Sequence, residues 1–422
     1  MKVRFHKMQL SNGVRILSEE IEGFPTVSFG IWVNVGSRDE RPKENGITHF
    51  IEHMLFKGTE HRSALEIAKE MDRLGGYSNA FTSRENTCLH AKVLPEDLPE
   101  LVELMIDLFL HSRFDPEDIE REKQIIRQEI NMVEDSPEEL IHELFGQFFW
   151  GNEALGRPVL GTWETVSRFD RKQLKDYFKR SYTGPQVVVA AAGDLDHKDL
   201  LDLIKPHFSL LPPEMRPPRK TPKPRPGLGV YEKDLEQVHF VLGVPTPGAT
   251  SEQRYAAMLF NTLLGGNMSS RLFQEIRERR GLAYAVYSYL SLYEDIGVLG
   301  VYAAVEKKDL KEALEVILRE IKALIAGKIL QEEFEAALAH LKSALLLSSD
   351  NPDTRMTRLA RNEILFKRYI PYEETLQRLR ALTPEELPSF AEKIFRHRPA
   401  LVVLGPVQEK DLELPAELLF GL

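Results

Sequence analysis

The pattern of apolar and polar residues predicts strands and helices that do not alternate strictly along the chain. Asn12-Gly13, flanked by alternating apolar residues, is typical of a β-hairpin over residues 8–18. Residues 64–74 have the pattern of an amphipathic helix, with Ser63 as its N-cap and Gly75 as its stop. Further strands are expected at 26–35 and within 77–93, on both sides of a turn near 83–86, and further helices at 47–56, 95–111 and 116–134. This order favours an α+β fold with a largely antiparallel sheet.

The two halves of the chain resemble each other. The strand pattern at 27–33 matches 238–244 at an offset of 211, and the apolar run at 188–193 matches 400–405 at an offset of 212. The helical segment at 115–129 matches one that starts near residue 330, at an offset of 215. Similar offsets at three places predict a duplicated domain.

A proline-rich stretch lies between the halves. Residues between 206 and 229 combine repeated prolines with five Lys and Arg residues. Proline removes backbone donors and favours extended structure, so this stretch is expected to be a semi-rigid linker. The expected organisation is a domain at 1–211, a linker at 212–229 and a homologous domain at 230–422. Each domain is expected to be a largely antiparallel sheet packed with helices.

Composition narrows the classes of partner and of metal site. The chain has 55 Lys and Arg against 65 Asp and Glu, a net charge of −10, so it lacks the basic character that nucleic-acid binding needs. There is no run of 18 apolar residues and no apolar signal-peptide core, which predicts a cytoplasmic protein without a membrane partner. Cys88 is the single cysteine and is expected to be a buried apolar residue. Any metal must therefore be held by histidines and carboxylates.

The segment His49-Phe50-Ile51-Glu52-His53 is the strongest chemical signal. His49 and His53 share one face of the predicted helix, where both imidazoles can reach one metal ion, and Glu52 can reach a water on that ion. Hydrogen-bonded core histidines are the alternative. The H-x-x-E-H spacing on a buried helix favours the metal site, because it is a zinc peptidase signature. The other histidines, for example His61, His90, His111 and His142, have no ligand spacing and are expected to be surface or core residues.

A tetrahedral zinc site needs a third protein ligand. In the helix predicted at 116–134, Glu122 and Glu129 fall within an apolar stripe, where a carboxylate needs a partner. Two interpretations are open: buried salt bridges, or Glu129 as third ligand with Glu122 supporting the ligands from behind. The stripe comprises Ile119, Ile125, Ile126, Ile130, Met132 and Val133.

With these motifs the sequence resembles the pitrilysin, insulin-degrading enzyme and mitochondrial processing peptidase family of inverted-motif zinc peptidases. In that family a Glu about 76 residues after the second histidine is the third ligand, and here 129 − 53 = 76. The resemblance implies that Glu129 is this ligand and that Glu122, seven residues earlier, is the family's second functional carboxylate. It also implies that Asn79 and Ala80 lie in an edge strand that binds the substrate backbone.

The second half carries another feature of that family. Arg277 and Tyr284, seven residues apart, match a pair that binds the substrate carbonyl and stabilises the oxyanion. Without the resemblance, the arginines around Arg277 would be interpreted as a solvated basic face. The zinc motif is absent from this half, where the corresponding positions are Ala257, Phe260 and Asn261 for the first motif and Ala337 and Ala344 for the two glutamates.

The expected function is that of a zinc metalloendopeptidase with one Zn²⁺ per chain, held by His49, His53 and Glu129. Glu52 is the expected general base, and the substrate is a peptide or unfolded segment held as an added strand inside a closed chamber. By resemblance such a chamber contains four domains, so the chain is expected to form a homodimer, or a heterodimer with a degenerate paralogue. The alternative is a non-catalytic or partner-dependent peptide-binding subunit of the same fold.

Overall fold

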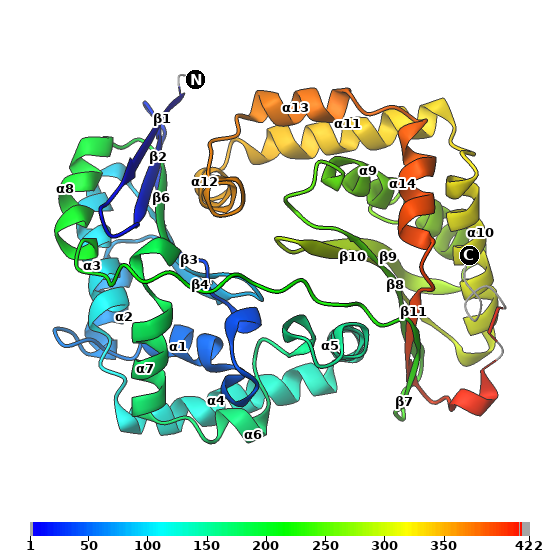
Figure 1. Cartoon of the computed structure of the whole chain (residues 1–422), viewed down its shortest axis with the longest axis horizontal. Coiled ribbons are helices and arrows are strands. Elements are labelled where there is room, and N and C mark those ends of the chain that lie inside the picture. The colour runs from blue at the N-terminus through cyan, green and yellow to red at the C-terminus, as the bar shows by residue number, and fades with distance from the viewer. Residues whose placement is uncertain (1–2, 413, 416–422) are drawn as a thin grey trace. The chain divides into compact units, whose positions relative to one another are not determined.

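The computed structural model describes residues 3–412 and 414–415, so the outermost ends of the two predicted domains, 1–2 and 416–422, lie outside it. The chain forms two compact units, each an α+β arrangement of one sheet packed with helices (Figure 1). The predicted fold class is confirmed. Unit 1 comprises Met1–Met132, Arg157–Lys220 and Leu347–Tyr369, and unit 2 comprises Val133–Gly156, Thr221–Leu346 and Ile370–Leu422.

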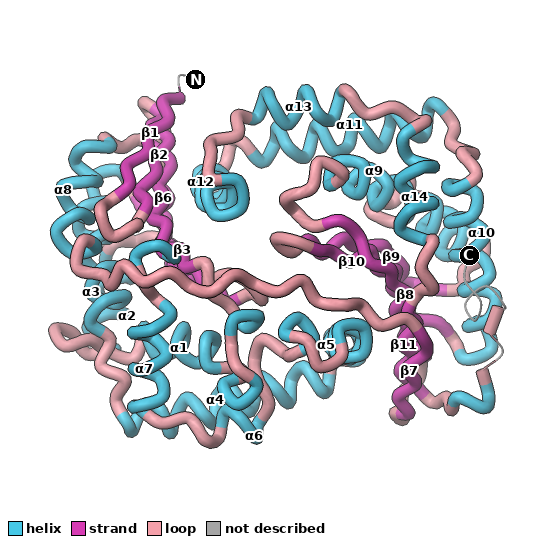
Figure 2. The backbone as a smooth tube through the Cα atoms, in the orientation of Figure 1, coloured by secondary structure: helices cyan, strands magenta, loops and turns pink. Residues whose placement is uncertain are grey.

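The sheet of unit 1 has six strands in the order β1-β2-β6-β3-β5-β4. Only β2 and β6 pair in parallel, and the other neighbours are antiparallel. β4 is therefore an edge strand with one free side. The strands are β1 (Val3–Gln9), β2 (Arg15–Ile21), β3 (Val27–Val33), β4 (Tyr77–Thr82), β5 (Thr87–Val93) and β6 (Val187–Gly193), drawn in magenta in Figure 2.

Helices cover both faces of this sheet. One face and its helices form the main core, in which Phe29 and Ile31 of β3 lie among apolar residues such as Phe50 and Met105 from the helices. On the other face, Trp32 and Val188 pack against Met356 and Ala360 of α12. The helices are α1 (Ile47–Leu55), α2 (Ala64–Arg73), α3 (Leu98–His111), α4 (Pro116–Asp135, which ends in unit 2), α6 (Trp163–Val166), α7 (Arg171–Ser181), α8 (His197–Phe208) and α12 (Pro352–Phe366).

The sheet of unit 2 repeats five strands of the first sheet. Its order is β7-β11-β8-β10-β9, and again only the first pair is parallel, as in β2-β6-β3-β5-β4. β3 and β8 begin at Val27 and Val238, which is the predicted offset of 211. The elements are β7 (Gly227–Glu232), β8 (Val238–Pro247), β9 (Ala283–Leu292), β10 (Ile296–Val305), β11 (Ala400–Gly405), α5 (Pro137–Trp150), α9 (Arg254–Leu264), α10 (Leu310–Ile325), α11 (Gln331–Ser348, which ends in unit 1), α13 (Tyr372–Arg380) and α14 (Glu386–Phe395).

Each half of the chain lends one helix to the sheet of the other half. α5, from the first half, packs on Val241 and Tyr302 of the second sheet, whereas α12, from the second half, packs on the first sheet. The compact units are therefore discontinuous in sequence and differ from the continuous domains predicted at 1–211 and 230–422. The physical reason is that both faces of each sheet are apolar and need cover, and an amphipathic helix does not reveal which sheet it will cover.

Most locally predicted elements are present. The Asn12-Gly13 turn joins β1 to β2 with Gly13 at a φ of 93°, a value that glycine adopts without strain. The Ser63 side chain accepts a hydrogen bond from the backbone N–H of Glu66 and caps α2 as expected. Cys88 is fully buried in β5.

Two local predictions were wrong in detail. α8 ends at Phe208 and β7 begins at Gly227, so the segment without regular structure ends three residues before the end of the predicted linker, 212–229. In α4, Ile125 and Met132 are exposed, while Lys123 is buried. The buried stripe of this helix is narrower than the sequence pattern indicated and is centred on Ile119, Glu122 and Ile126.

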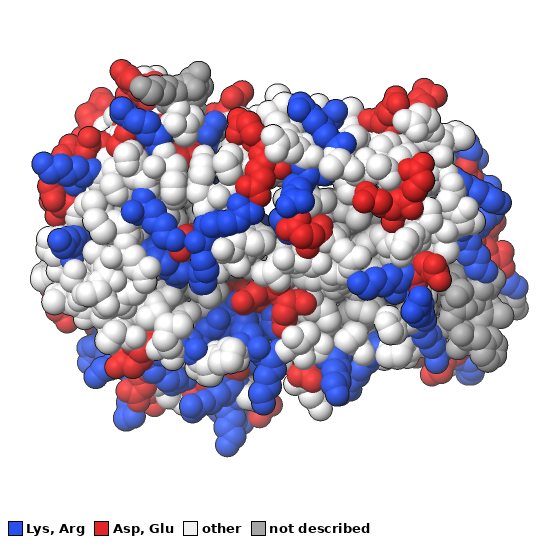
Figure 3. Space-filling view, turned by 45° about the horizontal axis from the view of Figure 1, so that its top comes forward, with Lys and Arg blue, Asp and Glu red and all other residues white. Residues whose placement is uncertain are grey.

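Two features of the structure bear on the membrane and nucleic-acid partners that the sequence analysis did not expect. Within the described residues, no helix is long and apolar enough to cross a membrane. Acidic and basic side chains are interspersed on the face drawn in Figure 3, rather than separated into a broad field of one sign.

Candidate metal centre

The N-terminus of α1 is held by a buried carboxylate. Glu40 accepts hydrogen bonds from the backbone N–H groups of Gly46 (2.8 Å) and Thr48 (2.9 Å) and from the side-chain amide of Asn45 (3.1 Å). The two backbone groups are donors that a helix start leaves without partners inside the helix. Burial raises the pKa of Glu40 to about 7, and the three donors oppose that rise. Glu40 thus fixes the start of the helix that carries the H-x-x-E-H motif.

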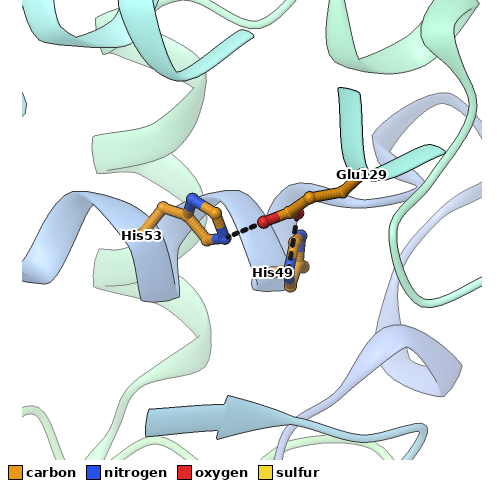
Figure 4. Close-up of side chains that lie close together, drawn as sticks. All are labelled: His49, His53 and Glu129. Atoms are coloured by element: carbon orange, nitrogen blue, oxygen red, sulfur yellow. Dashed lines mark ion pairs between the residues drawn. The ribbon is translucent and has the colours of Figure 1, made fainter. Parts of the chain in front are cut away.

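The three predicted ligands lie together on α1 and α4. His49 Nε2 is 3.8 Å from one carboxylate oxygen of Glu129, and His53 Nε2 is 3.6 Å from the other. Figure 4 shows the Glu129 carboxylate reaching towards both rings, which project from successive turns of α1. One ligand atom from each residue lies within 4.8 Å of the other two.

This arrangement fits a zinc ion. In a tetrahedral zinc site of nitrogen and oxygen ligands, neighbouring ligand atoms are about 3.4 Å apart, so small shifts suffice. Glu129 Oε2 is buried and has no hydrogen-bond partner among the described residues, as expected of an atom whose partner is an ion. Burial, followed by the nearby His53, lowers the pKa of His49 to about 3, so its ring is neutral and able to bind a metal.

Glu122 lies behind His53. It accepts hydrogen bonds from His53 Nδ1 at 2.9 Å and from Lys57 Nζ at 2.8 Å, and only 2% of its surface is exposed. Although burial lowers the pKa of His53, the hydrogen bond to Glu122 and the surrounding carboxylates raise it above its ordinary value. The contact fixes the ring so that Nε2 faces Glu129, which is the usual arrangement behind a metal-binding histidine.

Glu52 interacts electrostatically with the ligands His53 and Glu129 and also contacts the edge strand β4. Its Oε2 accepts a short hydrogen bond (2.6 Å) from the hydroxyl of Thr82, the last residue of β4. Burial raises the pKa of Glu52 above its ordinary value, which the Thr82 hydroxyl opposes. A carboxylate with a raised pKa is a stronger base, as a general base requires.

The outer side of β4 carries the predicted substrate-binding pair. Asn79 is exposed, and its Oδ1 accepts a hydrogen bond from the backbone N–H of Ala80 at 2.9 Å. β5 is the single neighbour of β4 in the sheet, so the Ala80 N–H has no strand partner and uses a side chain instead. The aromatic rings of Tyr77 and Phe81 on the same strand are also exposed.

The Arg277 and Tyr284 pair lies in unit 2. The guanidinium of Arg277 lies 4.3 Å from the ring centre of Tyr284 and 4.8 Å from that of Phe273. Arg277 belongs to a π-helical turn (Phe273–Glu278) and Tyr284 to the edge strand β9, where 79% of its surface is exposed. The two side chains are thus stacked and accessible.

Unit 2 has a helix that corresponds to α1, but apolar residues stand at the positions of His49 and Glu52. Ala257 and Phe260, at the positions that correspond to His49 and Glu52, are buried in the apolar core of unit 2 on α9. Among residues 3–412 and 414–415, no group of three His, Cys, Asp or Glu ligand atoms gathers in unit 2.

Sequence reasoning missed Glu40, Lys57 and Thr82. Glu40 lies six residues before Gly46, too far for a local capping motif, and Thr82 meets Glu52 through the fold alone. The role of Lys57 could have been predicted. It lies four residues after His53, and a carboxylate in an apolar stripe, such as that of Glu122, was expected to need a partner.

Removing the Glu40 carboxylate is expected to destabilise α1. In Glu40→Ala three donors lose their acceptor, and each buried donor without a partner costs about 1–3 kcal/mol, so we expect about 2–4 kcal/mol in total after partial rehydration. Urea unfolding and zinc titration of the variant measure both effects, with Glu117→Ala on the exposed side of α4 as control. A loss of stability equal to that of the control would contradict this role.

Comparisons with known proteins identify the family of the chain. Residues 15–163 match the family model "Insulinase (Peptidase family M16)", and residues 168–341 match "Peptidase M16 inactive domain". The chain is 37% identical to an uncharacterized zinc protease of Streptomyces coelicolor over 95% of this chain and 90% of that one. It is 40% identical to one of Mycobacterium leprae (97% and 93%) and 38% identical to one of Bacillus subtilis (94% and 97%).

Solved structures share the fold over nearly the whole chain. A protease from Helicobacter pylori superposes with a TM-score of 0.89 at 22% identity, covering 96% of this chain and 100% of that one. A Pseudomonas fluorescens protein described as a peptidase M16 inactive domain gives the same TM-score at 19% identity, covering 96% and 99%. The two family models, the similarity to zinc proteases along the chain and the two α+β units agree: the chain belongs to peptidase family M16, the pitrilysin family, and is of its small two-domain type.

Proposed function

We propose that the chain is a zinc endopeptidase that cleaves peptides or unfolded segments. One observation carries the proposal: Glu52 interacts electrostatically with His53 and Glu129 and is hydrogen-bonded to Thr82 at the end of an edge strand. A substrate strand added to β4 would therefore lead towards Glu52 and the metal centre. Neither a structural histidine pair nor a buried salt bridge requires a base at the end of a substrate-binding edge.

The residues divide the chemistry among them. His49, His53 and Glu129 would hold Zn²⁺, which when bound lowers the pKa of a water molecule towards about 7 and polarises the scissile carbonyl. Glu52 accepts the proton of the attacking water and delivers it to the leaving amine. Arg277 and Tyr284 carry donors suited to the carbonyl oxygen as negative charge develops on it. Glu122 and Lys57 hold His53 in its orientation.

The edge strand implies an extended substrate. A bound peptide would pair with β4 by main-chain hydrogen bonds and replace the Asn79 side chain at the N–H of Ala80. Tyr77 and Phe81 lie two residues before and after Asn79, on the same exposed face of the strand. Their rings offer apolar contacts to substrate side chains. A folded protein cannot supply such a strand without unfolding locally, so we propose peptides and unfolded segments as the substrate class.

The partner is proposed to be a second copy of the chain. The zinc-binding half of one chain would face the Arg277 and Tyr284 half of another in a closed chamber, so a homodimer carries every part. A heterodimer with a degenerate paralogue is the variant of this proposal. We place the enzyme in the cytoplasm, in keeping with the expectation from the sequence.

Hydrolysis of a pool of quenched, unstructured peptides tests the function. We expect turnover by the zinc-loaded chain, loss of turnover after chelation, recovery on addition of zinc, and no turnover by Glu52→Gln. A stably folded protein serves as a control substrate and should remain intact. If the zinc-loaded chain binds peptides but does not cleave any, the peptide-binding subunit replaces the peptidase as the better interpretation.

Mixing two inactive variants tests the shared chamber. Chains with Glu52→Gln and Tyr284→Phe, carrying different tags, are co-expressed and the mixed dimer is isolated by both tags. We expect its activity to exceed that of either parent, since one of its sites combines an intact Glu52 with an intact Tyr284. The shared chamber is wrong if no mixed dimer forms or if its activity stays at the level of the parents.

A further inference from the structure

A second group of ligand-type side chains lies at the end of α3 and shares no residue with the centre described above. His61, Asp107 and His111 each offer one ligand atom, and these atoms lie within 4.8 Å of one another. Asp107 and His111 are four residues apart on α3, so they share one face of the helix. His61 comes from the segment after α1, which a β-bridge between Thr59 and Ser112 holds against the end of α3.

Asp107 has a buried oxygen that nothing in the described chain satisfies. The residue is only 4% exposed, and its Oδ2 accepts hydrogen bonds from Thr59 Oγ1 (2.7 Å) and Arg62 Nη1 (2.8 Å). Its Oδ1 is buried and has no hydrogen-bond partner among the described residues. Across from Oδ1 lies the ring nitrogen His61 Nε2, at 3.9 Å. Burying a carboxylate oxygen without a partner is costly, so the geometry favours a cation between these side chains.

We propose that His61, Asp107 and His111 form a second zinc site. Two imidazoles and one carboxylate are a donor set typical of Zn²⁺, with the fourth position left to water. The 3.9 Å between His61 Nε2 and Asp107 Oδ1 is close to the 3.6 and 3.8 Å between the histidine and carboxylate atoms of the first centre. The His61 side chain is 59% exposed and free to move the remaining distance.

The second site binds zinc more weakly than the first. Asp107 shares its negative charge with Arg62, and His61 must lose conformational freedom to become a ligand. At the first centre His53 is already held by Glu122. The second ion would tie the segment that follows α1 to α3, and it adds one ion to the single zinc per chain expected from the sequence.

Zinc stoichiometry of the full chain tests the site. The chain is stripped with a chelator and titrated with zinc chloride by calorimetry, as wild type, His61→Ala and the double variant His49→Ala/His53→Ala. We expect two zinc ions per wild-type chain and one in each variant, with the site that remains in His61→Ala being the tighter one. His207→Ala, an exposed histidine on α8, is the matched control and should still bind two.

Two results would overturn the second site: one zinc per wild-type chain, or the same stoichiometry in His61→Ala as in wild type. The latter would leave His61 beside Asp107 without a metal ion between them. Because His61 is exposed, its replacement should leave the fold intact, and thermal unfolding in the presence of chelator verifies this. The readout is metal binding alone, so it is independent of whether the chain hydrolyses peptides.

Discussion

Replacing Glu52 with glutamine is expected to lower kcat by roughly 10²–10⁴-fold while zinc remains bound, which is the range expected for loss of a general acid–base residue. Glutamine has nearly the same shape, and its amide oxygen can still accept the hydrogen bond that Thr82 donates to Glu52. It cannot accept the proton of the attacking water. The measurement is kcat on a peptide cleaved by the wild type, together with the zinc content of the same preparation.

A smaller effect is expected at Thr82. In Thr82→Val the base remains, but the 2.6 Å hydrogen bond that orients it is lost, so kcat should fall less than in Glu52→Gln. Thr87→Val, on the neighbouring strand β5, removes a buried hydroxyl that donates to the carbonyl of Val35 and serves as the control for local packing. Retention of wild-type kcat by Glu52→Gln would remove Glu52 from the mechanism.

Replacing Glu129 with alanine is expected to weaken zinc binding more than any change behind the ligands, and to abolish turnover at limiting zinc. The variant leaves two imidazoles on α1 and no carboxylate, so the ion loses a negatively charged ligand as well as a bond. Competition with a chromogenic chelator gives the affinity.

Two further variants on α4 provide zinc affinities with which that of Glu129→Ala can be compared. Glu122→Gln should lower zinc affinity by about 10–100-fold, as expected for loss of a carboxylate behind a metal-binding histidine. Glu117→Gln, a change on an exposed part of the same helix, should leave affinity unchanged. If Glu129→Ala binds zinc no more weakly than Glu122→Gln, then Glu129 is not a ligand, and the interpretation of the α4 carboxylates as buried ion pairs gains support.

The sequence was most informative where chemistry depends on local spacing. His49 and His53 needed only the helical repeat to share a face, and the repeated apolar runs predicted a duplicated domain. Glu122 and Glu129 were predicted to need a partner because they are charged residues in an apolar stripe. Part of that stripe is solvent-exposed in the fold. Their contacts with the histidines join α1 and α4, which lie more than sixty residues apart in the chain.

By itself the sequence determined the α+β class and the candidate zinc motif, because these depend on periods and spacings of a few residues. It also determined the duplication, because segments of the two halves match at similar offsets. Tertiary structure decided which helix covers which sheet, as α5 and α12 illustrate. It also decided which distant groups meet: Thr82 beside Glu52, and His61 beside Asp107. The reason is physical: such contacts join residues far apart in the chain, and their free energy comes from burial and pairing in the folded state, which no local pattern encodes.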